Sequence, residues 1–340
     1  MSTPGAQGAY TCPFCRMASE GASHTCPHCG APVDVSLRVS DSGWLEQPPI
    51  RDMARIRFGH STCQISGGYV PVAEMDLRGE EWVYFSHHSL LHTDTNVTLN
   101  NMPMKGGWKR MRAGLPLMMM FAKGPGHVAF SADAPGETLA IPLAPGRAID
   151  VVEHSFLVAT GNVEYQWENA NVWFTTRDGD DTEWHYPVGQ TMDRFTAAGS
   201  NGLLLLHAPG NTFIRDLGPD QRILVQPGAL VWKDQSVAMF LHFEYPGGAY
   251  WFSSASWQAK TTWLALQGPG RVAVKSVFER PEHTGYVYQH SGATQMSWNS
   301  GASQGFQSSG GSGGQVARGL LGGALGGFLG SAISSILDDD

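Results

Sequence analysis

The chain has 340 residues and a formal net charge of -8, from 30 acidic and 22 basic side chains. This acidic balance provides no general electrostatic footprint for a polyanion, which argues against a general nucleic-acid-binding protein. Glycine (42) and proline (20) are abundant and charged residues make up only 15%. Short apolar runs between turn residues favour an all-β fold with an ample core.

Residues 1–30 hold four of the five cysteines, as two CxxC pairs: Cys12 with Cys15, and Cys26 with Cys29. Thiolates on two tight turns can close a tetrahedron around a metal ion, so the spacing predicts a small zinc ribbon with a structural zinc ion. Four cysteine ligands leave no open coordination position, which argues against catalysis by the metal. No secretory signal opens the sequence, so we expect a cytoplasmic protein.

Residues 31–55 are interpreted as a linker and lead-in, because prolines break any helix there. From 56 to 282, short strand patterns follow one another and predict antiparallel sheets. The alternation of apolar and polar residues from Val163 to Trp167 is typical of a half-buried strand. Cys63, the fifth cysteine, is expected to be a small buried apolar residue.

Two motifs recur three times in this β domain and predict one β module used in triplicate. The first is a glycine turn followed by a β-rich run, at Gly79 to Leu91, Gly146 to Leu157 and Gly228 to Ala238. The second is an apolar run that leads into a corner, at Gly124-Pro125-Gly126, Ala208-Pro209-Gly210 and Gly268-Pro269-Gly270. Proline fixes φ and glycine accepts positive φ, so each corner is expected to join two strands.

Two polar clusters have alternative interpretations. His87, His88 and His92, followed by Asp94, suggest a metal site, but we interpret them as surface and turn residues because a strand points His87 away from the others. The basic cluster is either a contact for lipid or RNA phosphates or an exposed strand edge guarded by cations. It consists of Lys105, Lys109, Arg110 and Arg112.

Residues 283–314 end in a Gly/Ser-rich linker, and residues 315–340 form an apolar, glycine-rich tail. On a helix, six glycines spaced by four would line two adjacent faces and allow close helix approach. They are Gly319, Gly323 and Gly327, and Gly322, Gly326 and Gly330. The tail is long enough to span a bilayer, but glycine disfavours a helix in water. Membrane association, self-assembly and disorder in isolation all remain open for it.

An ordered series of short motifs resembles the family named for altered inheritance of mitochondria, over roughly residues 55–282. The motifs include Trp108-Lys109-Arg110-Met111, Gly124-Pro125-Gly126-His127-Val128, Ile149-Asp150-Val151 and Gly268-Pro269-Gly270-Arg271-Val272. The resemblance implies triplicated antiparallel β-sandwich units in a pseudo-threefold arrangement, similar to the tryptophan RNA-binding attenuation protein. It implies no established reaction. Eukaryotic members are mitochondrial and tied to inner-membrane architecture; the added ribbon and tail suggest a bacterial variant.

The sequence therefore predicts a non-enzymatic scaffold or adaptor, because no acid, base and nucleophile converge in it. The tail would bring copies together as a homo-oligomer or hold them at a membrane, and the ribbon would contact a protein partner. The alternative is a module that binds RNA or a small ligand in grooves between the repeats. The acidic charge weighs against RNA, and likeness of fold alone is a weak argument for function.

Overall fold

The computed structural model describes residues 10–19, 25–31, 42–46, 55–102, 119–178, 180–243, 262–279 and 286–291. All of them belong to one compact unit of the chain, Met1–Met296. Within them the regular structure is 26 β-strands and two short 3-10 turns, η1 (His87–Ser89) and η2 (Pro227–Ala229). The predicted all-β fold is confirmed.

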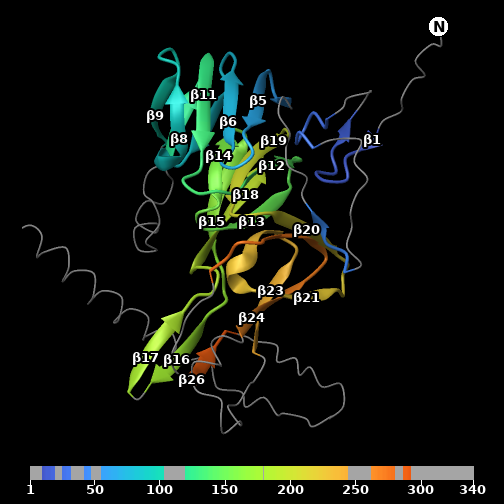
Figure 1. Cartoon of the computed structure of the whole chain (residues 1–340), viewed down its shortest axis with the longest axis vertical. Helices are drawn as coiled ribbons and strands as arrows, with labels where there is room; N and C mark the ends of the chain where they lie inside the picture. Colours follow the sequence, from blue (N-terminus) through green and yellow to red (C-terminus); the bar gives the residue numbers. More distant parts are fainter. Residues whose placement is uncertain are drawn as a thin grey trace, which may run out of the picture. The chain divides into compact units, whose positions relative to one another are not determined.

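Three repeats of six strands form the β domain (Figure 1). The first has β6 (Val72–Leu77), β7 (Trp82–Phe85), β8 (Leu90–Thr93), β9 (Thr98–Met102), β10 (Met119–Lys123) and β11 (Gly126–Ser131). The second has β12 (Glu137–Leu143), β13 (Ala148–Val152), β14 (Phe156–Thr160), β15 (Val163–Asn169), β18 (Thr191–Ala197) and β19 (Gly202–Ala208). The third has β20 (Thr212–Leu217), β21 (Arg222–Val225), β22 (Leu230–Asp234), β23 (Ala238–Phe243), β24 (Thr262–Gln267) and β25 (Gly270–Lys275).

Strand pairing is the same in every repeat. The first, sixth and third strands pair in that order, as β6-β11-β8, β12-β19-β14 and β20-β25-β22. The second, fifth and fourth pair likewise, as β7-β10-β9, β13-β18-β15 and β21-β24-β23. All these pairs are antiparallel. Apolar residues of both sheets pack into shared cores, so each repeat is a small β-sandwich, as expected.

Neighbouring repeats are joined by pairing between a second strand and a third strand. At the first joint, β7 of repeat 1 pairs with β14 of repeat 2. At the second joint, β13 of repeat 2 pairs with β22 of repeat 3. These joints create a six-stranded and a seven-stranded sheet. A closed threefold arrangement would add a third pairing, between β21 and β8, but both strands lie at the ends of their sheets among the described residues.

The structure corrects the third copy of the first sequence motif. The glycine turns at Gly79 and Gly146 precede β7 and β13, so the counterpart in repeat 3 is the turn 218–221, which precedes β21. Gly228, where the copy was expected to begin, lies instead in η2 between β21 and β22. Each repeat contains several turns with similar residues, and the sequence does not say which turn is which.

The second motif needs a similar correction. The corners at Gly124-Pro125-Gly126 and Gly268-Pro269-Gly270 join the fifth strand of a repeat to the sixth. The corner of repeat 2 at that place is 198–201, which contains no proline. Ala208-Pro209-Gly210 instead connects repeat 2 to repeat 3. Proline and glycine mark a turn but not its place in the fold.

Further strands extend this framework. β4 (Arg55–Phe58) and β5 (Ser61–Ser66) form a hairpin that pairs with β6, and β3 (Leu45–Glu46) pairs with β20. In repeat 2, β16 (Phe174–Asp178) and β17 (Asp181–His185) form a hairpin whose sheet also contains β26 (Tyr286–His290). Cys63 in β5 is fully buried as expected, and burial raises the pKa of its thiol to about 12. The predicted domain boundaries stay a prediction.

Candidate metal centre

The four paired cysteines converge on one point. Their Sγ atoms all lie within 4.8 Å of one another, with 3.8 Å between Cys12 and Cys29 and 3.7 Å between Cys15 and Cys26. A tetrahedral zinc site with Zn–S bonds of about 2.3 Å has sulfur–sulfur edges of about 3.8 Å. All four side chains are buried. The donor set and its spacing therefore fit a four-cysteine metal site in a small zinc ribbon.

Both pairs of cysteines sit on turns of the same construction. The N–H of Arg16 donates to the carbonyl of Cys12 (2.7 Å), and the N–H of Gly30 donates to the carbonyl of Cys26 (2.8 Å). Arg16 and Gly30 both adopt positive φ, 62° and 74°. This left-handed conformation bends the chain back after the second cysteine of each pair, so that both thiols face one centre. The short strands β1 (Tyr10–Thr11) and β2 (Ala18–Ser19) flank the first turn.

The thiols also influence one another. A hydrogen bond with Cys15 is the main cause that lowers the pKa of Cys12 to about 7, and hydrogen bonds, first of all with Cys12, lower the pKa of Cys26 as well. The pKa values of Cys15 and Cys29 are raised, in both cases first by a hydrogen bond with Cys12. Four thiols this close share their protons, and a bound cation would replace those protons as the partner of the sulfur atoms.

The ribbon is packed against the β domain. Phe14, 4% exposed, lies with two of the cysteines across a narrow gap of about 20 Å³ from β12 and Trp232. The cysteine side chains belong to the same core cluster as Ile56 of β4 and Leu205 of β19. Burial of this apolar surface fixes the ribbon to repeats whose residues lie far away in the sequence.

Polar contacts also hold the ribbon in place. Arg16 forms an ion pair with Asp216 of β20 at 2.5 Å, and the N–H of Arg57 in β4 donates to the carbonyl of Pro27 at 3.0 Å. Asp216 also lies 3.4 Å from Arg271, which is 4% exposed and whose pKa is lowered by burial. Sequence reasoning did not find these residues, because no local pattern marks contacts between residues so far apart in the sequence.

Residues 63–277 match the family described as Mitochondrial biogenesis AIM24. The chain belongs to this family. The predicted resemblance is confirmed, and the four cysteines lie outside the matched range.

A crystal structure with a similar fold supports the same architecture. It is a protein of Streptococcus pyogenes, with a TM-score of 0.50 and 18% sequence identity, and the similarity covers 64% of this chain and 94% of that one. At this identity the likeness concerns the fold alone. A search of curated proteins gives no match.

The predicted histidine cluster of this AIM24 chain does not form a metal site within the described part. The four-cysteine group is the one set of three or more metal-type ligands found there. Asp94 instead accepts a hydrogen bond from the backbone N–H of His127 at 2.8 Å and lies 3.0 Å from its Nδ1 atom. These contacts lower the pKa of Asp94, with the backbone hydrogen bond as the largest cause. The exposed side chains of His88 and His92 agree with surface positions.

The remaining predicted site residues lie outside the described residues. They are Lys105, Lys109, Arg110 and Arg112 of the basic cluster and Gly319, Gly322, Gly323, Gly326, Gly327 and Gly330 of the tail. Among the residues that are described, no helix has the length and apolar character needed to cross a membrane.

A second charged group, also missed by sequence reasoning, lies at the second joint. Asp150 of β13 accepts hydrogen bonds from Lys233 Nζ at 2.8 Å and from Arg194 Nε at 2.7 Å. Burial alone would raise the pKa of Asp150, but these two cations lower it overall. Asp150 and Lys233 are 4% and 7% exposed. The pair links repeat 2 to repeat 3 in the core of the sheet.

Proposed function

We propose that this AIM24 family member is a non-enzymatic scaffold or adaptor. Its β domain would hold a zinc ribbon in a fixed position for a protein partner. The glycine-rich tail at 315–340 would bring copies together or attach them to a membrane. The family description names mitochondrial biogenesis. For this chain we propose a role in organising other molecules, without a reaction of its own. We place the protein in the cytoplasm or at a membrane that faces it.

The observation that carries this proposal is the docked ribbon. Flexible attachment would leave a small metal module free to tumble, whereas here Phe14 and Arg16 tie it to the repeats. One face of the ribbon is therefore covered by its own chain. Among the described residues of the ribbon, Thr11, Pro13 and Ala18 have exposed side chains, and these would contact the partner. Rigid presentation of a surface lowers the entropy cost of binding, which suits an adaptor.

We assign the metal as zinc with a structural role. Four cysteine thiolates in a tetrahedron are the donor set of structural zinc sites, and such a site is coordinatively closed. When bound, the ion supplies folding free energy to a segment too short to form a core alone. Cys12, Cys15, Cys26 and Cys29 would be its ligands, and the ribbon would keep its docked shape only while the ion is present.

The test compares the full-length chain with a version that ends at Ser300. We would measure the mass of both by light scattering and their flotation with vesicles of phosphatidylcholine and phosphatidylserine. The proposal expects that the full-length chain is larger than the shortened chain, or that it floats with vesicles while the shortened chain does not. Two identical, non-floating species would remove the tail from the mechanism. Measurable turnover by the purified core would contradict the non-enzymatic assignment.

A cleft favours the second candidate, a module that binds a small ligand between repeats. The cleft measures about 490 Å³ and is lined by three connections: Gly67–Pro71 between β5 and β6, 134–139 leading into β12, and Pro209–Asn211 between β19 and β20. Tyr69 at its rim is 76% exposed. Mostly apolar clefts with a few polar groups are typical ligand sites.

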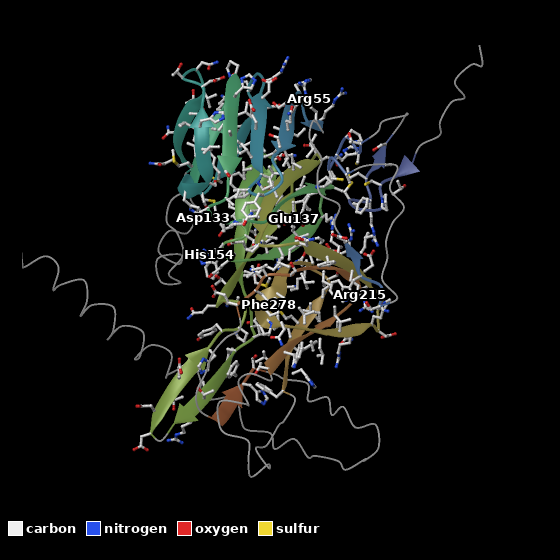
Figure 2. All side chains as sticks on the ribbon, in the orientation of Figure 1. Arg55, Asp133, Glu137, His154, Arg215 and Phe278 are labelled. Atoms are coloured by element: carbon white, nitrogen blue, oxygen red, sulfur yellow. The ribbon has the colours of Figure 1, made fainter. Side chains whose placement is uncertain are left out.

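One polar group sets the chemistry of that cleft. Glu137 (labelled in Figure 2) accepts a hydrogen bond from the N–H of Thr212 at 2.8 Å, and burial raises its pKa. An apolar molecule with a donor group would fit such a lining. If an apolar amine quenches the fluorescence of Tyr69 or raises the melting temperature of the protein, this candidate is supported. An unchanged melting temperature with such probes, and with a Tyr69→Ala control, would exclude it.

A further inference from the structure

Among the second and third strands of the three repeats, which are the strands that form the joints, two have an open edge. Among the described strands, β8 pairs with β11 alone and β21 pairs with β24 alone, so each lies at the end of its sheet. β8 is the third strand of its repeat and β21 is the second strand of its repeat. These are the two kinds of strand that meet at both joints. An open edge presents unpaired N–H and C=O groups and acts as a template for another strand.

The third strands can be compared position by position, because all three carry the same bulge. It falls after Leu90 in β8, after Phe156 in β14 and after Leu230 in β22, each opposite the equivalent residue of a sixth strand. The residue inside the bulge is Leu91, Leu157 or Val231. A bulge conserved within a set of repeats fixes the register and the twist of its strand. β8 therefore has the backbone form of the two strands that already form joints.

The bulge residue of β8 is more exposed than the bulge residues of β14 and β22, as expected for a strand without a partner on that edge. Leu157 and Val231, in the bulges of the joined strands, are 3% and 0% exposed, whereas Leu91 in β8 is 56% exposed. The exposure of Leu91 is therefore explained by the missing neighbour strand, because the equivalent side chains at both formed joints are buried.

The same contrast holds on the other side. At the position of Leu224 in β21 the joined second strands have Tyr84 and Asp150, which are 0% and 4% exposed. Leu224 and its neighbour Ile223 are only partly buried. Both open edges thus expose apolar side chains at positions that are buried in the formed joints. Each edge therefore lacks a neighbouring strand.

We infer that β8 of one chain pairs with β21 of a second copy, in the antiparallel register of the two joints. At those joints Tyr84 lies opposite Ala159, and Asp150 lies opposite Lys233. The equivalent pair in the new joint is Thr93 of one chain opposite Leu224 of the second copy. Neither of these two side chains is charged. The next pair places Asp94 opposite Ile223, as Asp234 lies opposite Ile149 at the second joint, and Asp94 has a hydrogen bond from the N–H of His127.

The backbone at the rim of the joint supports this register. At the first joint the N–H of Gly161 donates to the carbonyl of Trp82 at 2.9 Å, and at the second the N–H of Gln235 donates to the carbonyl of Ala148 at 3.3 Å. The equivalent donor after β8 is Thr95, and the equivalent acceptor in β21 is Arg222. This bond would continue the ladder across two chains.

The joint between copies has a direction, because each chain offers one β8 edge and one β21 edge. Such a head-to-tail interface produces a ring if the rotation closes and an open array if it does not. Stacked repeats commonly gain stability from each added neighbour interface. This surface lies in the β domain and goes beyond the proposed role of the tail in self-association.

The test uses three full-length variants with the same kind of change. Thr93→Asp alters the β8 edge, Leu224→Asp alters the β21 edge, and Thr182→Asp is a matched control on the outer strand β17. We would measure mass against protein concentration by sedimentation, with circular dichroism to verify folding. Wild type and Thr182→Asp are expected to associate. Each edge variant should weaken association by roughly a hundredfold or more, because a buried unpaired carboxylate is strongly unfavourable.

Mixing the two edge variants is the decisive step. The Thr93→Asp chain retains its β21 edge and the Leu224→Asp chain retains its β8 edge, so the mixture should form a 1:1 pair and nothing larger. Wild type that stays monomeric at all concentrations would overturn the inference. Edge variants as large as wild type would also overturn it and leave self-association to the tail. A mixture without the 1:1 pair would exclude the head-to-tail geometry.

Discussion

Asp150→Asn is expected to lower the free energy of unfolding by about 3 kcal/mol. The amide has the same shape as the carboxylate but removes the charge that neutralises Lys233, whose side chain is only 8% exposed. Breaking a buried ion pair costs about 3–5 kcal/mol because one charge remains without a partner. We expect a loss at the lower end of this range, because Arg194 keeps its second carboxylate partner, Glu168, at 3.0 Å.

The effect should depend on pH in a direction that the structure defines. The folded state lowers the pKa of Asp150 below its ordinary value of 3.8, through Arg194 and Lys233 acting against burial. A depressed pKa stabilises the fold above the pKa of the unfolded chain, and this stabilisation is lost as the pH falls through the folded pKa. The difference between wild type and Asp150→Asn should therefore be full above about pH 5 and shrink below about pH 4.

Urea unfolding followed by tryptophan fluorescence measures this difference, with Trp232 of β22 reporting from the second joint. Glu168→Gln is the matched control, because Glu168 is 45% exposed and should cost less than about 1 kcal/mol. Adding Lys233→Met to Asp150→Asn should restore part of the lost stability, since it removes the uncompensated charge. A loss below about 1 kcal/mol for Asp150→Asn, or one that stays constant from pH 7 to pH 3, would refute the reasoning.

Three further outcomes are expected. Metal analysis should find one zinc ion per chain. A thiol reagent at pH 8 should find no reactive thiol in the native protein and four after a chelator removes the metal. The fifth thiol, Cys63, should stay unreactive because burial raises its pKa to about 12, and five reactive thiols would contradict this. Arg16→Gly should change the melting temperature little, because glycine accepts the positive φ at this position and this gain offsets the lost surface ion pair. Gly30→Ala forces an alanine into a positive φ and should lower the stability of the ribbon by about 1 kcal/mol, measured by zinc affinity. Gly161→Ala should cost about 1–3 kcal/mol in urea unfolding, because its Cβ would lie 2.2 Å from the Trp82 ring; an unaffected variant would show that this ring can move.

The four-cysteine cluster was predictable from the sequence because all four thiols lie in two local motifs. The CxxC spacing sets the turn geometry, and the turn sets the direction of the thiols. The docking of the ribbon was not predictable. Arg16 meets Asp216 only because repeat 3 folds back towards the N-terminal segment, and a single ion pair between exposed side chains leaves no pattern in either stretch.

The threefold repetition was also predictable, but the position of each turn within its repeat was not. Alternating apolar residues and Pro-Gly corners identify strands and turns, so the all-β class followed from local chemistry. The assignment of each turn to its place in the repeat needs the pairing of strands, which is a long-range property. Gly228 illustrates this limit, because it is a turn glycine in a β-rich segment and yet belongs to the turn after the one expected.

The two formed joints and the proposed joint have the same backbone register but different side chains at their central residue pair. This difference in side chains can determine which strands pair. The first joint has Tyr84 opposite Ala159, and the second has the ion pair of Asp150 with Lys233. If β13 instead met β8, Asp150 would lie opposite Thr93 and lose the cation that Lys233 supplies. Such a mispairing would bury a carboxylate with one fewer counter-charge and is disfavoured by several kcal/mol. The buried ion pair therefore directs repeat 2 to repeat 3 and leaves the β8 edge for the β21 edge of another copy.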